Sequence, residues 1–229
     1  MTNVIAIDGP SYVGKSTVAR CLAQLTGYVY INTGHMYRAV AKKCLETRLS
    51  TEDVVAVATI ARAMRIEFKP AEEGNSLTFV DGEDMTQKLA SHEIVIAASR
   101  VASIPAVREI LTDLQRSYAK SYMIIMEGRD IGSTVFPDAR WKFFITASPI
   151  VRARRMRKVM DEENKKRFPD AEMLIPKIEE LDRNDTSRKI SPLRQAEDAI
   201  VYDNSESPTE KEDALVLNSY LTGELSWKK

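Results

Sequence analysis

Asn3-Val-Ile-Ala-Ile-Asp-Gly9-Pro-Ser-Tyr-Val-Gly14-Lys15-Ser16-Thr17 is the most informative stretch of the sequence. It begins as a short apolar run, matches the pattern G-x-x-x-x-G-K-[ST] from Gly9 to Ser16, and continues into a helix-like segment. This pattern forms a phosphate-binding loop when it follows a strand and opens a helix. Both flanks have that character, so we expect the loop to bind the phosphates of ATP.

Each residue type of this loop has a chemical role in phosphate binding. Gly9 and Gly14 allow the backbone to curl until successive N–H groups point inward, and the helix that starts near Lys15 adds the positive end of its dipole. The Lys15 ammonium brings charge to the β- and γ-phosphates, and the Ser16 hydroxyl is a ligand for the Mg²⁺ that accompanies ATP. The expected ATP-phosphate site is Gly9, Pro10, Ser11, Tyr12, Val13, Gly14, Lys15, Ser16 and Thr17.

Apolar runs and helix-like segments alternate along the chain. Buried strands are expected at residues 3–7, 28–31, 122–126, 141–145 and 199–202. Helices are expected at residues 15–25, 35–47, 52–64, 105–119, 149–160 and 171–183. This alternation predicts an α/β fold in which a five-stranded parallel sheet carries helices on both faces. Ligands of such sheets bind beyond the carboxyl ends of the strands.

Residues 64–93 depart from that alternation. Apolar and polar residues alternate on both sides of Glu72-Glu73-Gly74-Asn75, and another turn signal follows at Asp81-Gly82. The pattern predicts a small antiparallel insertion. The core domain is then expected to comprise residues 1–63 and 94–222, with a charged loop at 161–168 and a frayed C-terminus at 223–229.

The overall composition argues against several classes of protein. The 229 residues contain 33 Lys and Arg against 33 Asp and Glu, and a chain without net charge creates no broad positive field for duplex nucleic acid or a membrane surface. The two cysteines, Cys21 and Cys44, are too few for a disulfide framework and are expected to be small core residues. The sequence shows no secretory signal or membrane-spanning run, so we expect a cytoplasmic protein without nucleic-acid or membrane partners.

A second anion site is predicted where the next strands end. Thr33-Gly34 opens a helix, for which we expect Thr33 to be the capping residue, and Arg38 follows within reach of an acceptor phosphate. Glu127 comes after the strand at 122–126, where a carboxylate that organises Mg²⁺ or its water shell is expected, and Arg129 faces the same crevice. The alternatives are a capped helix with a surface arginine and a solvated loop.

Further basic residues follow the fourth strand. Arg152 and Arg155 are three residues apart, so they share a helix face that can close over transferring phosphates, although a basic run is more often a solvated face. His35 is expected to be a loop residue and not a catalytic one, because phosphoryl transfer needs no histidine. The motif N-K-x-D of switch GTPases and the motif L-S-G-G-Q of transporter ATPases are absent from the sequence, which leaves a small-molecule or nucleotide kinase.

Four motifs occur in collinear order. They are G-P-x-x-x-G-K-S-T-V-A-R at 9–20, T-G-x-M-Y-R at 33–38, G-R-D-I-G-S-T-V-F-P-D-A at 128–139 and S-P-L-x-x-A-E-D-A at 191–199. This combination resembles the bacterial cytidylate kinase family over about Val4 to Ser205, and the third motif is the most specific. The resemblance implies a P-loop kinase fold, transfer of the ATP γ-phosphoryl group to CMP or dCMP with Mg²⁺, a mobile nucleotide-binding insertion at about 64–93, and a short lid near 160–169.

The resemblance also implies roles for individual residues. Those implied to bind CMP are Arg38, Arg129 and Arg188 at the phosphate, Ser99, Arg108 and Asp130 at the cytosine, Asp185 at the ribose, and Thr33 and Tyr37 beside them. The residues implied to act in catalysis are Lys15, Arg129, Arg152, Arg155 and Arg188. Ser16 would hold Mg²⁺ directly and Glu127 through water, and we expect the chain to act as a monomer.

Four positions depart from the family pattern. Glu127 replaces an aspartate, Asn32 replaces an aspartate before the second motif, Ser133 is unusual in the third, and Leu181 stands where an arginine is common. Without that arginine, Asp185 is expected to be held loosely and to discriminate little between CMP and dCMP. Two alternatives stay open: another small P-loop kinase, acting on UMP, shikimate or dephospho-coenzyme A, and a non-catalytic nucleotide-binding relative.

Overall fold

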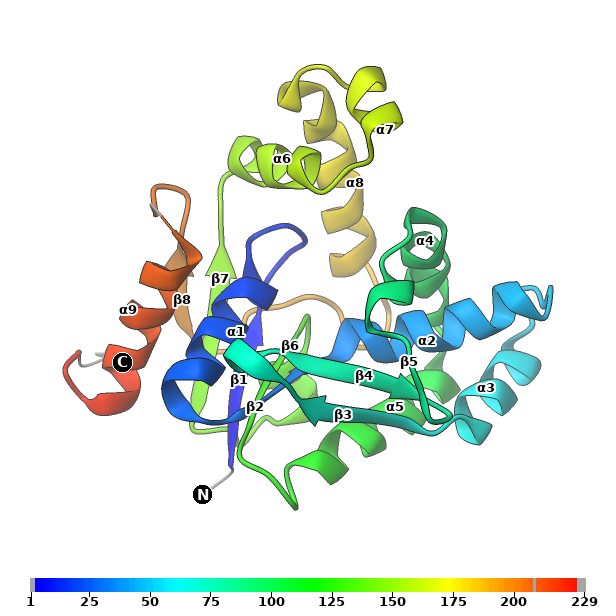
Figure 1. The fold of residues 1–229 in the computed structure, drawn as a ribbon, viewed down its shortest axis with the longest axis horizontal. Coiled ribbons are helices and arrows are strands. Elements are labelled where there is room, and N and C mark those ends of the chain that lie inside the picture. The colour runs from blue at the N-terminus through cyan, green and yellow to red at the C-terminus, as the bar shows by residue number, and fades with distance from the viewer. Residues whose placement is uncertain (1–2, 208, 226–229) are drawn as a thin grey trace.

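Five parallel strands form the central sheet of the computed structural model, which describes residues 3–207 and 209–225 (Figure 1). The strands are β1 (Val4–Asp8), β2 (Val29–Asn32), β6 (Ile124–Gly128), β7 (Trp141–Thr146) and β8 (Ile200–Asp203). Their order is β2-β6-β1-β7-β8, and neighbouring strands pair in parallel. The predicted α/β class and five-stranded sheet are confirmed, with β1 in the middle.

Helices cover both faces of this sheet. Val4 and Ala6 of β1 lie in one buried cluster, whereas Ile5 and Ile7 lie in another on the opposite face. The first cluster includes residues of α2 (Thr33–Glu46), α3 (Val54–Ala63), α4 (His92–Val101) and α5 (Pro105–Tyr118). The second includes residues of α1 (Lys15–Thr26) and α9 (Glu210–Thr222). A strand that is buried on both faces needs apolar residues at every position, as β1 has.

Most of the helices agree with their sequence patterns, and one loop does not. The expected helices at 15–25, 35–47, 52–64 and 105–119 are present as α1, α2, α3 and α5, and the one at 149–160 is α6 (Pro149–Lys158). The segment at 171–183 divides into a short 3₁₀ turn, Ala171–Leu174, and α8 (Ile175–Thr186). The prediction of a loop at 161–168 is wrong, because residues Glu162–Arg167 form α7, whose first turn is capped by the Asp161 carboxylate. The helices α4 and α9 were not predicted from the sequence pattern.

A separate antiparallel sheet forms within residues 64–93, as the sequence pattern predicts. It consists of β3 (Ile66–Pro70), β4 (Ser76–Val80) and β5 (Glu83–Asp84), in that order. Asp81 and Gly82 both have positive φ, at 51° and 88°, which is the geometry of a tight hairpin turn. The other turn packs on α1 so closely that a Cβ at Gly74 would lie 2.1 Å from the Arg20 carbonyl oxygen. The small sheet is therefore in contact with the helix that follows the phosphate loop.

A third, small apolar cluster lies beyond the carboxyl edge of the main sheet. It contains Ala153 and Met156 of α6 with Leu174 and Ile178, which lie at and after the 3₁₀ turn. This cluster shares no buried residue with the two that cover the sheet, so α6, α7 and α8 form a unit of their own above it (Figure 1).

Three smaller expectations concern the chain as a whole. Cys44 is buried and Cys21 is partly buried, each packed in an apolar cluster, and both are free thiols. Of the predicted frayed C-terminus, residues 226–229 lie outside the described residues, and Gly223 ends α9 with φ of 83°. Among the described residues, no helix has the length and apolar character needed to cross a membrane.

Candidate functional site

The loop between β1 and α1 has a backbone that only glycine can adopt at its two ends. Gly9 has φ of 149°, and a Cβ there would lie 2.1 Å from the carbonyl oxygen of Ile145 in β7. Gly14 has φ of 92° and precedes the first residue of α1. A side chain at either position would be strained, and at Gly9 it would also overlap the neighbouring strand. The two glycines of the motif therefore shape the loop as the sequence predicts.

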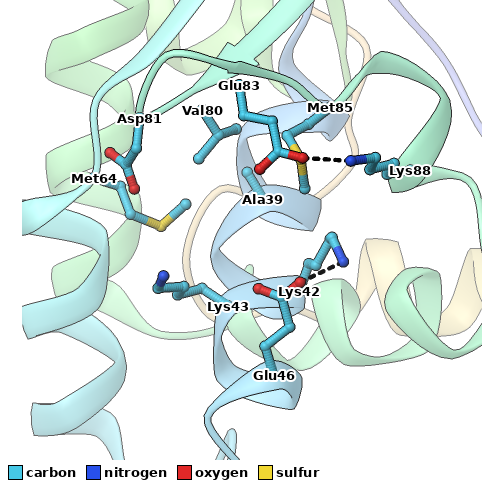
Figure 2. Close-up of a pocket in the computed structure, with 10 residues that line it drawn as sticks. All are labelled: Ala39, Lys42, Lys43, Glu46, Met64, Val80, Asp81, Glu83, Met85 and Lys88. Atoms are coloured by element: carbon cyan, nitrogen blue, oxygen red, sulfur yellow. Dashed lines mark hydrogen bonds and ion pairs between the residues drawn. The ribbon is translucent and has the colours of Figure 1, made fainter.

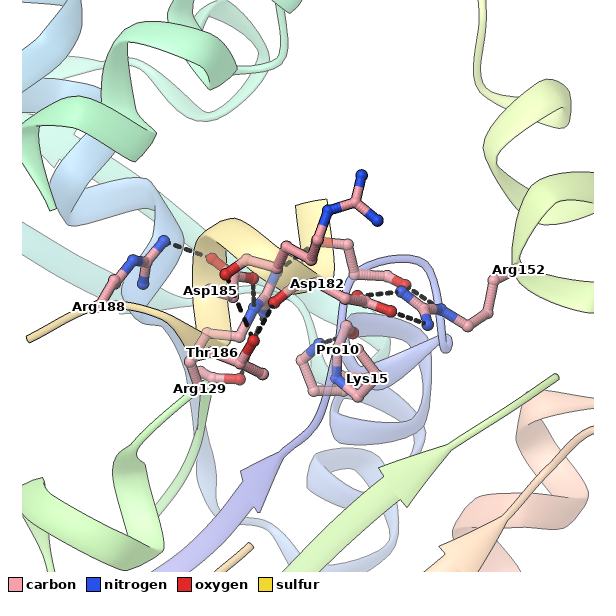
Figure 3. Close-up of polar contacts among 11 residues, drawn as sticks. Pro10, Lys15, Arg129, Arg152, Asp182, Asp185, Thr186 and Arg188 are labelled. Atoms are coloured by element: carbon pink, nitrogen blue, oxygen red, sulfur yellow. Dashed lines mark hydrogen bonds and ion pairs between the residues drawn. The ribbon is translucent and has the colours of Figure 1, made fainter. Parts of the chain in front are cut away.

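Lys15 is buried at the start of α1, with 5% of its surface exposed. Its Nζ donates to the carbonyl oxygen of Pro10 at 2.6 Å, across the loop (Figure 3). Burial and the positive charge of Arg129 lower the pKa of Lys15 to about 7, against the opposing effect of Glu127. A lysine held in this way strongly favours an additional anion, because a phosphate would restore the charge partner that the site lacks.

Glu127, at the end of β6, joins three other segments of the chain. Its Oε1 accepts hydrogen bonds from Ser16 Oγ and from Tyr30 Oη, each at 2.6 Å. Its backbone oxygen accepts from Thr33 Oγ1 at 2.8 Å. The prediction that Thr33 caps α2 is wrong, because its hydroxyl is used across the sheet and Asn32 precedes the helix without a side-chain cap. Tyr30 was not predicted, since a tyrosine inside an apolar strand gives no signal of a polar role.

Ser16 and Glu127 fit the expected Mg²⁺. A hydroxyl and a carboxylate lie side by side next to the phosphate loop, and Mg²⁺ prefers such oxygen ligands. No group of three or more His, Cys, Asp and Glu side chains that could hold a metal alone occurs within 3–207 and 209–225. Such a donor set suits an ion that keeps several waters and is bound largely through nucleotide phosphates.

Asp185, on α8, lies between two arginines (Figure 3). Arg129 Nε donates to Asp185 Oδ2 at 2.6 Å, and Arg188 Nη2 donates to Oδ1. Burial alone would raise the pKa of Asp185, but Arg129 and Arg188 outweigh it and hold the pKa below its usual range. Arg129 also donates to Ser11 Oγ at 2.7 Å, so this group adjoins the phosphate loop.

The expectation that Asp185 is loosely held is therefore wrong. Leu181 stands where an arginine was expected, and Arg183 is exposed and lies 4.0 Å from Glu179, away from Asp185. The two arginines that fix Asp185 are Arg129, from the segment after β6, and Arg188, two residues beyond the end of α8. They hold the carboxylate without an arginine at position 181.

Arg152 and Arg155, on α6, both reach the backbone of the phosphate loop. Arg152 Nε donates to the Ser11 carbonyl oxygen at 2.8 Å, and its two Nη atoms bind both oxygens of Asp182 (Figure 3). Arg155 Nη1 donates to the Val13 carbonyl oxygen at 3.0 Å. The shared helix face that the sequence predicts therefore lies over the loop. Asp182 was not among the predicted site residues.

Arg108 and Asp130 form a buried ion pair at 2.5 Å, with 5% and 8% of their side-chain surfaces exposed. The Arg108 guanidinium lies 5.4 Å from the centre of the Tyr37 ring, and burial raises the pKa of Tyr37 to about 12. Arg108 Nε is buried without a hydrogen-bond partner among the described residues. A buried donor without a partner requires an explanation, and a bound ligand with an acceptor at that point would supply one.

Arg38 and Ser99 are the remaining residues of the predicted acceptor site. Both are half-buried, Arg38 on α2 and Ser99 on α4. Within the part of the chain that the structure describes, Arg38 makes no hydrogen bond or ion pair, and burial lowers its pKa from the usual value. A half-buried arginine without a partner among the described residues is available for a phosphate.

Asp8 adjoins the predicted site but was not among its predicted residues. It ends β1, and its two carboxylate oxygens accept from the backbone N–H groups of Ile131 and Gly132 at 2.8 and 2.7 Å. Burial raises the pKa of Asp8 to about 7. The carboxylate thus fixes the loop after β6, which carries Arg129 and Asp130. The position of Asp8 in the sequence, directly after an apolar run and before a glycine, could have indicated this role.

A model of the family described as cytidylate kinase matches residues 5–218. The chain belongs to the cytidylate kinase family. It is 45% identical over 207 residues to a cytidylate kinase of Pelotomaculum thermopropionicum, covering 90% of this chain and 91% of that protein. It is 42% identical over 226 residues to a cytidylate kinase of Porphyromonas gingivalis, covering 95% of each.

This member of the cytidylate kinase family also shares some similarity with solved structures. A shikimate kinase from Bacteroides thetaiotaomicron aligns with a TM-score of 0.49 at 13% identity, covering 97% of this chain and 98% of that one. A likeness of this degree carries no inference about function. The resemblance to cytidylate kinases predicted from the four motifs is confirmed by the family match.

Two hollows occur on the described surface of this cytidylate kinase relative. One of about 250 Å³ adjoins Arg188 and is lined by Ser103, Pro105, Arg188, Lys189 and Ile190. The other, of about 190 Å³, lies between α2 and the small sheet (Figure 2). Two of the lysines that line it are already paired with acidic residues, Lys42 with Glu46 and Lys88 with Glu83. It contains none of the predicted site residues.

Proposed function

We propose that this protein transfers the γ-phosphoryl group of ATP to CMP, giving ADP and CDP, and that dCMP is also an acceptor. The observation that carries the proposal is the position of Arg129, which donates both to Ser11 in the phosphate loop and to Asp185 in the arginine–aspartate group. One side chain would thereby adjoin both the proposed donor-phosphate loop and the proposed acceptor-phosphate site. Membership of the cytidylate kinase family supports the same reaction.

The donor nucleotide is proposed to bind through residues 9–17. Lys15 would exchange the Pro10 carbonyl oxygen, 2.6 Å away, for the β- and γ-phosphates. Ser16 and Glu127 would hold Mg²⁺, the first directly and the second through water. When bound, Mg²⁺ offsets the charge of the two phosphates that separate in the reaction.

The acceptor is proposed to bind at its phosphate, base and sugar. Arg38, Arg129 and Arg188 would hold the phosphate, with Thr33 and Tyr37 beside it. Ser99 and the Arg108–Asp130 pair would bind cytosine, whose exocyclic amine is a donor that a carboxylate accepts, whereas uracil presents a carbonyl there. Asp185 would accept from the ribose.

Catalysis is proposed to consist of positioning and charge neutralisation. The acceptor is already an anionic oxygen, and phosphoryl transfer passes through a loose transition state, so no strong base is needed. Lys15, Arg129, Arg152, Arg155 and Arg188 would share the developing charge. Closure of the insertion at 64–93 and the lid at 160–169 would exclude water and so suppress ATP hydrolysis. We place the protein in the cytoplasm as a monomer without nucleic-acid or membrane partners.

A coupled assay for ADP tests the proposal against its alternatives. The purified protein with Mg²⁺ and ATP is expected to phosphorylate CMP and dCMP well above UMP, AMP, shikimate and dephospho-coenzyme A. Equal rates with UMP or AMP would contradict the cytidine preference. ATP binding without transfer to any of the six acceptors would favour a non-catalytic nucleotide-binding relative.

A further inference from the structure

Two polar residues are completely buried behind the phosphate loop. Asn204 follows β8 directly and Asp213 lies in α9, and both have 0% of their surface exposed. A buried amide and a buried carboxylate are costly unless their hydrogen bonds are made. Neither residue belongs to the motifs or to the predicted site, and the proposed phosphoryl transfer uses neither.

Both polar atoms of the Asn204 side-chain amide make hydrogen bonds. Its Nδ2 donates to the Val13 carbonyl oxygen at 2.8 Å and to Asp213 Oδ2 at 2.9 Å. Its Oδ1 accepts from Arg155 Nη1 at 2.9 Å. Only this orientation satisfies the neighbours, because two acceptors face Nδ2 and a guanidinium faces Oδ1.

Asp213 fixes the direction of that amide. Its Oδ2 accepts from Asn204, while its Oδ1 accepts from Tyr202 Oη at 2.9 Å. Both carboxylate oxygens are thus engaged, one by the amide and one by the phenol. A charged acceptor also makes the stronger hydrogen bond, so Asp213 holds Asn204 Nδ2 more firmly than a neutral acceptor would.

The carbonyl of Val13 receives two donors, Asn204 Nδ2 and Arg155 Nη1 at 3.0 Å. The peptide that joins Val13 to Gly14 is planar and trans, so its carbonyl oxygen and its N–H point in opposite directions. A carbonyl fixed toward Asn204 therefore points the Gly14 N–H away from Asn204. In a loop of this kind, such N–H groups contact phosphate oxygens.

We infer that Asn204 is a positioning residue for ATP, which aims the Gly14 N–H at the phosphates and is itself oriented by Asp213. The inference rests on the proposed function for its ligand, ATP. It places part of the ATP affinity in α9, a helix that the loop motif does not include. It also gives Arg155 a role before any closure, as the second donor to Val13.

Exchanging the side chains of Asn204 and Asp213 separates an effect on ATP binding from an effect on protein stability. In Asn204→Asp, two carboxylates would face each other in a buried site, so the melting temperature is expected to fall. Adding Asp213→Asn restores a hydrogen bond between positions 204 and 213 with its direction reversed, and Arg155 retains an acceptor. The pair still lacks any donor to the Val13 carbonyl from position 204. We expect the double variant to regain most of the lost melting temperature while its Kd for ATP stays at least fivefold above that of the wild-type protein.

Two further variants complete the experiment. Tyr202→Phe removes the other partner of Asp213 without touching Asn204, so it should lower stability and leave the Kd for ATP within twofold. Asn204→Ala removes the donor without adding charge; it should raise the Kd for ATP at least fivefold and leave the KM for CMP within twofold. Asn204→Ala replaces the double variant as the test if the double variant does not fold.

The binding measurements use calorimetry with ATP and no acceptor, so they are independent of the proposed reaction. If wild-type protein binds ATP but transfers nothing to CMP, the proposed function fails while the role of Asn204 is still measured. If ATP affinity returns together with the melting temperature in the double variant, Asn204 is only a structural residue. Unchanged ATP affinity in Asn204→Ala, or an equal loss for ATP and CMP, would likewise overturn the inference.

Discussion

Ser16 Oγ donates to Glu127 Oε1 at 2.6 Å, although 111 positions separate the two residues in the chain. This bond joins the first turn of α1 to the end of β6 and places the two proposed Mg²⁺-binding groups together. Glu127 is one methylene longer than the aspartate that is common at this position in the family. Tyr30 Oη also donates to Glu127 Oε1. The longer side chain is therefore held in one position.

Replacing Glu127 tests its proposed role beside Mg²⁺. Glu127→Ala should raise the Mg²⁺ concentration for half-maximal rate at least tenfold, because one oxygen group that orders the ion's water shell is lost. Initial rates measured against Mg²⁺ concentration at saturating ATP give the result. Tyr30→Phe is the matched control, since it removes only the second donor to Oε1. A Mg²⁺ requirement unchanged by Glu127→Ala would exclude a role at the metal.

Lys15→Met should lower kcat at least a hundredfold, which corresponds to about 3 kcal/mol of lost transition-state stabilisation. The methionine fills the buried volume but leaves no charge to follow the phosphoryl group. Steady-state kinetics with CMP measures the loss, and the melting temperature shows whether the fold is kept. A kcat within a factor of a few of the wild-type value would show that Lys15 does not act in catalysis.

Asp130 is predicted to distinguish cytosine from uracil. Asp130→Ala would leave the Arg108 charge buried and unpaired, with an expected stability loss of about 3 kcal/mol. Asp130→Asn keeps the shape and is the better test of recognition. It should narrow the ratio of kcat/KM for CMP over UMP about tenfold, a change within the 1–3 kcal/mol typical of one mismatched hydrogen bond. If the ratio does not change, the base is recognised by other groups.

The sugar preference is expected to be weak, for a reason that the sequence does not show. Asp185 already accepts from Arg129 and Arg188, so a missing 2′-hydroxyl leaves no unpaired charge. We expect the kcat/KM values of CMP and dCMP to lie within about tenfold, or ~1.4 kcal/mol. Leu181→Arg should leave that ratio within twofold, since Asp185 is held without it. A hundredfold preference for either sugar would contradict this account.

His35 lies in the first turn of α2 and not in a loop, so its prediction as a loop residue is wrong, and the residue gives a pH dependence of stability. Its Nδ1 lies 2.8 Å from Thr78 Oγ1 in the small sheet, and burial, with the charge of Arg38, lowers its pKa to about 4. The unfolded chain takes up the proton near the usual pKa of about 6.5, so the stabilisation is present above that pH and is lost as the pH falls toward 4. Between pH 7 and pH 5, wild-type protein should lose about 2 kcal/mol more unfolding free energy than His35→Gln in urea titrations. Parallel losses in both proteins would refute the assignment.

The main sheet and the phosphate loop are predictable from local sequence. β1 is buried on both faces, so its residues are apolar without interruption, and glycine is required where φ is positive at Gly14. Short apolar runs therefore predict the strands, and the spacing of the motif predicts the phosphate loop. The order of the strands cannot be predicted in this way, because both strands that pair with β1 lie more than a hundred residues away in the chain.

The polar contacts of the site are much less predictable. Thr33 has the residue type of a helix cap, yet its hydroxyl bonds to Glu127 across the sheet. Asp213 lies in the charged run Glu210-Lys-Glu-Asp213, which is typical of a solvated face, yet it is fully buried. Leu181 correctly indicated a missing arginine. It did not indicate that Arg129 and Arg188 hold Asp185 instead. The partner of Thr33 and one partner of Asp185, Arg129, are distant in the chain. The partners of Asp213 are near it in the chain but lie in and just after another element, β8.

The central place of β1 has a consequence for synthesis on the ribosome. β1 pairs with β6 and β7, at residues 124–128 and 141–144, and Gly9 packs against Ile145. A nascent chain therefore carries the complete phosphate-loop motif long before it has the strands that shape it. A ribosome-bound chain arrested before residue 124 will not bind ATP. Any stabilisation by the proposed nucleotide ligand is therefore expected only after most of the chain has been translated.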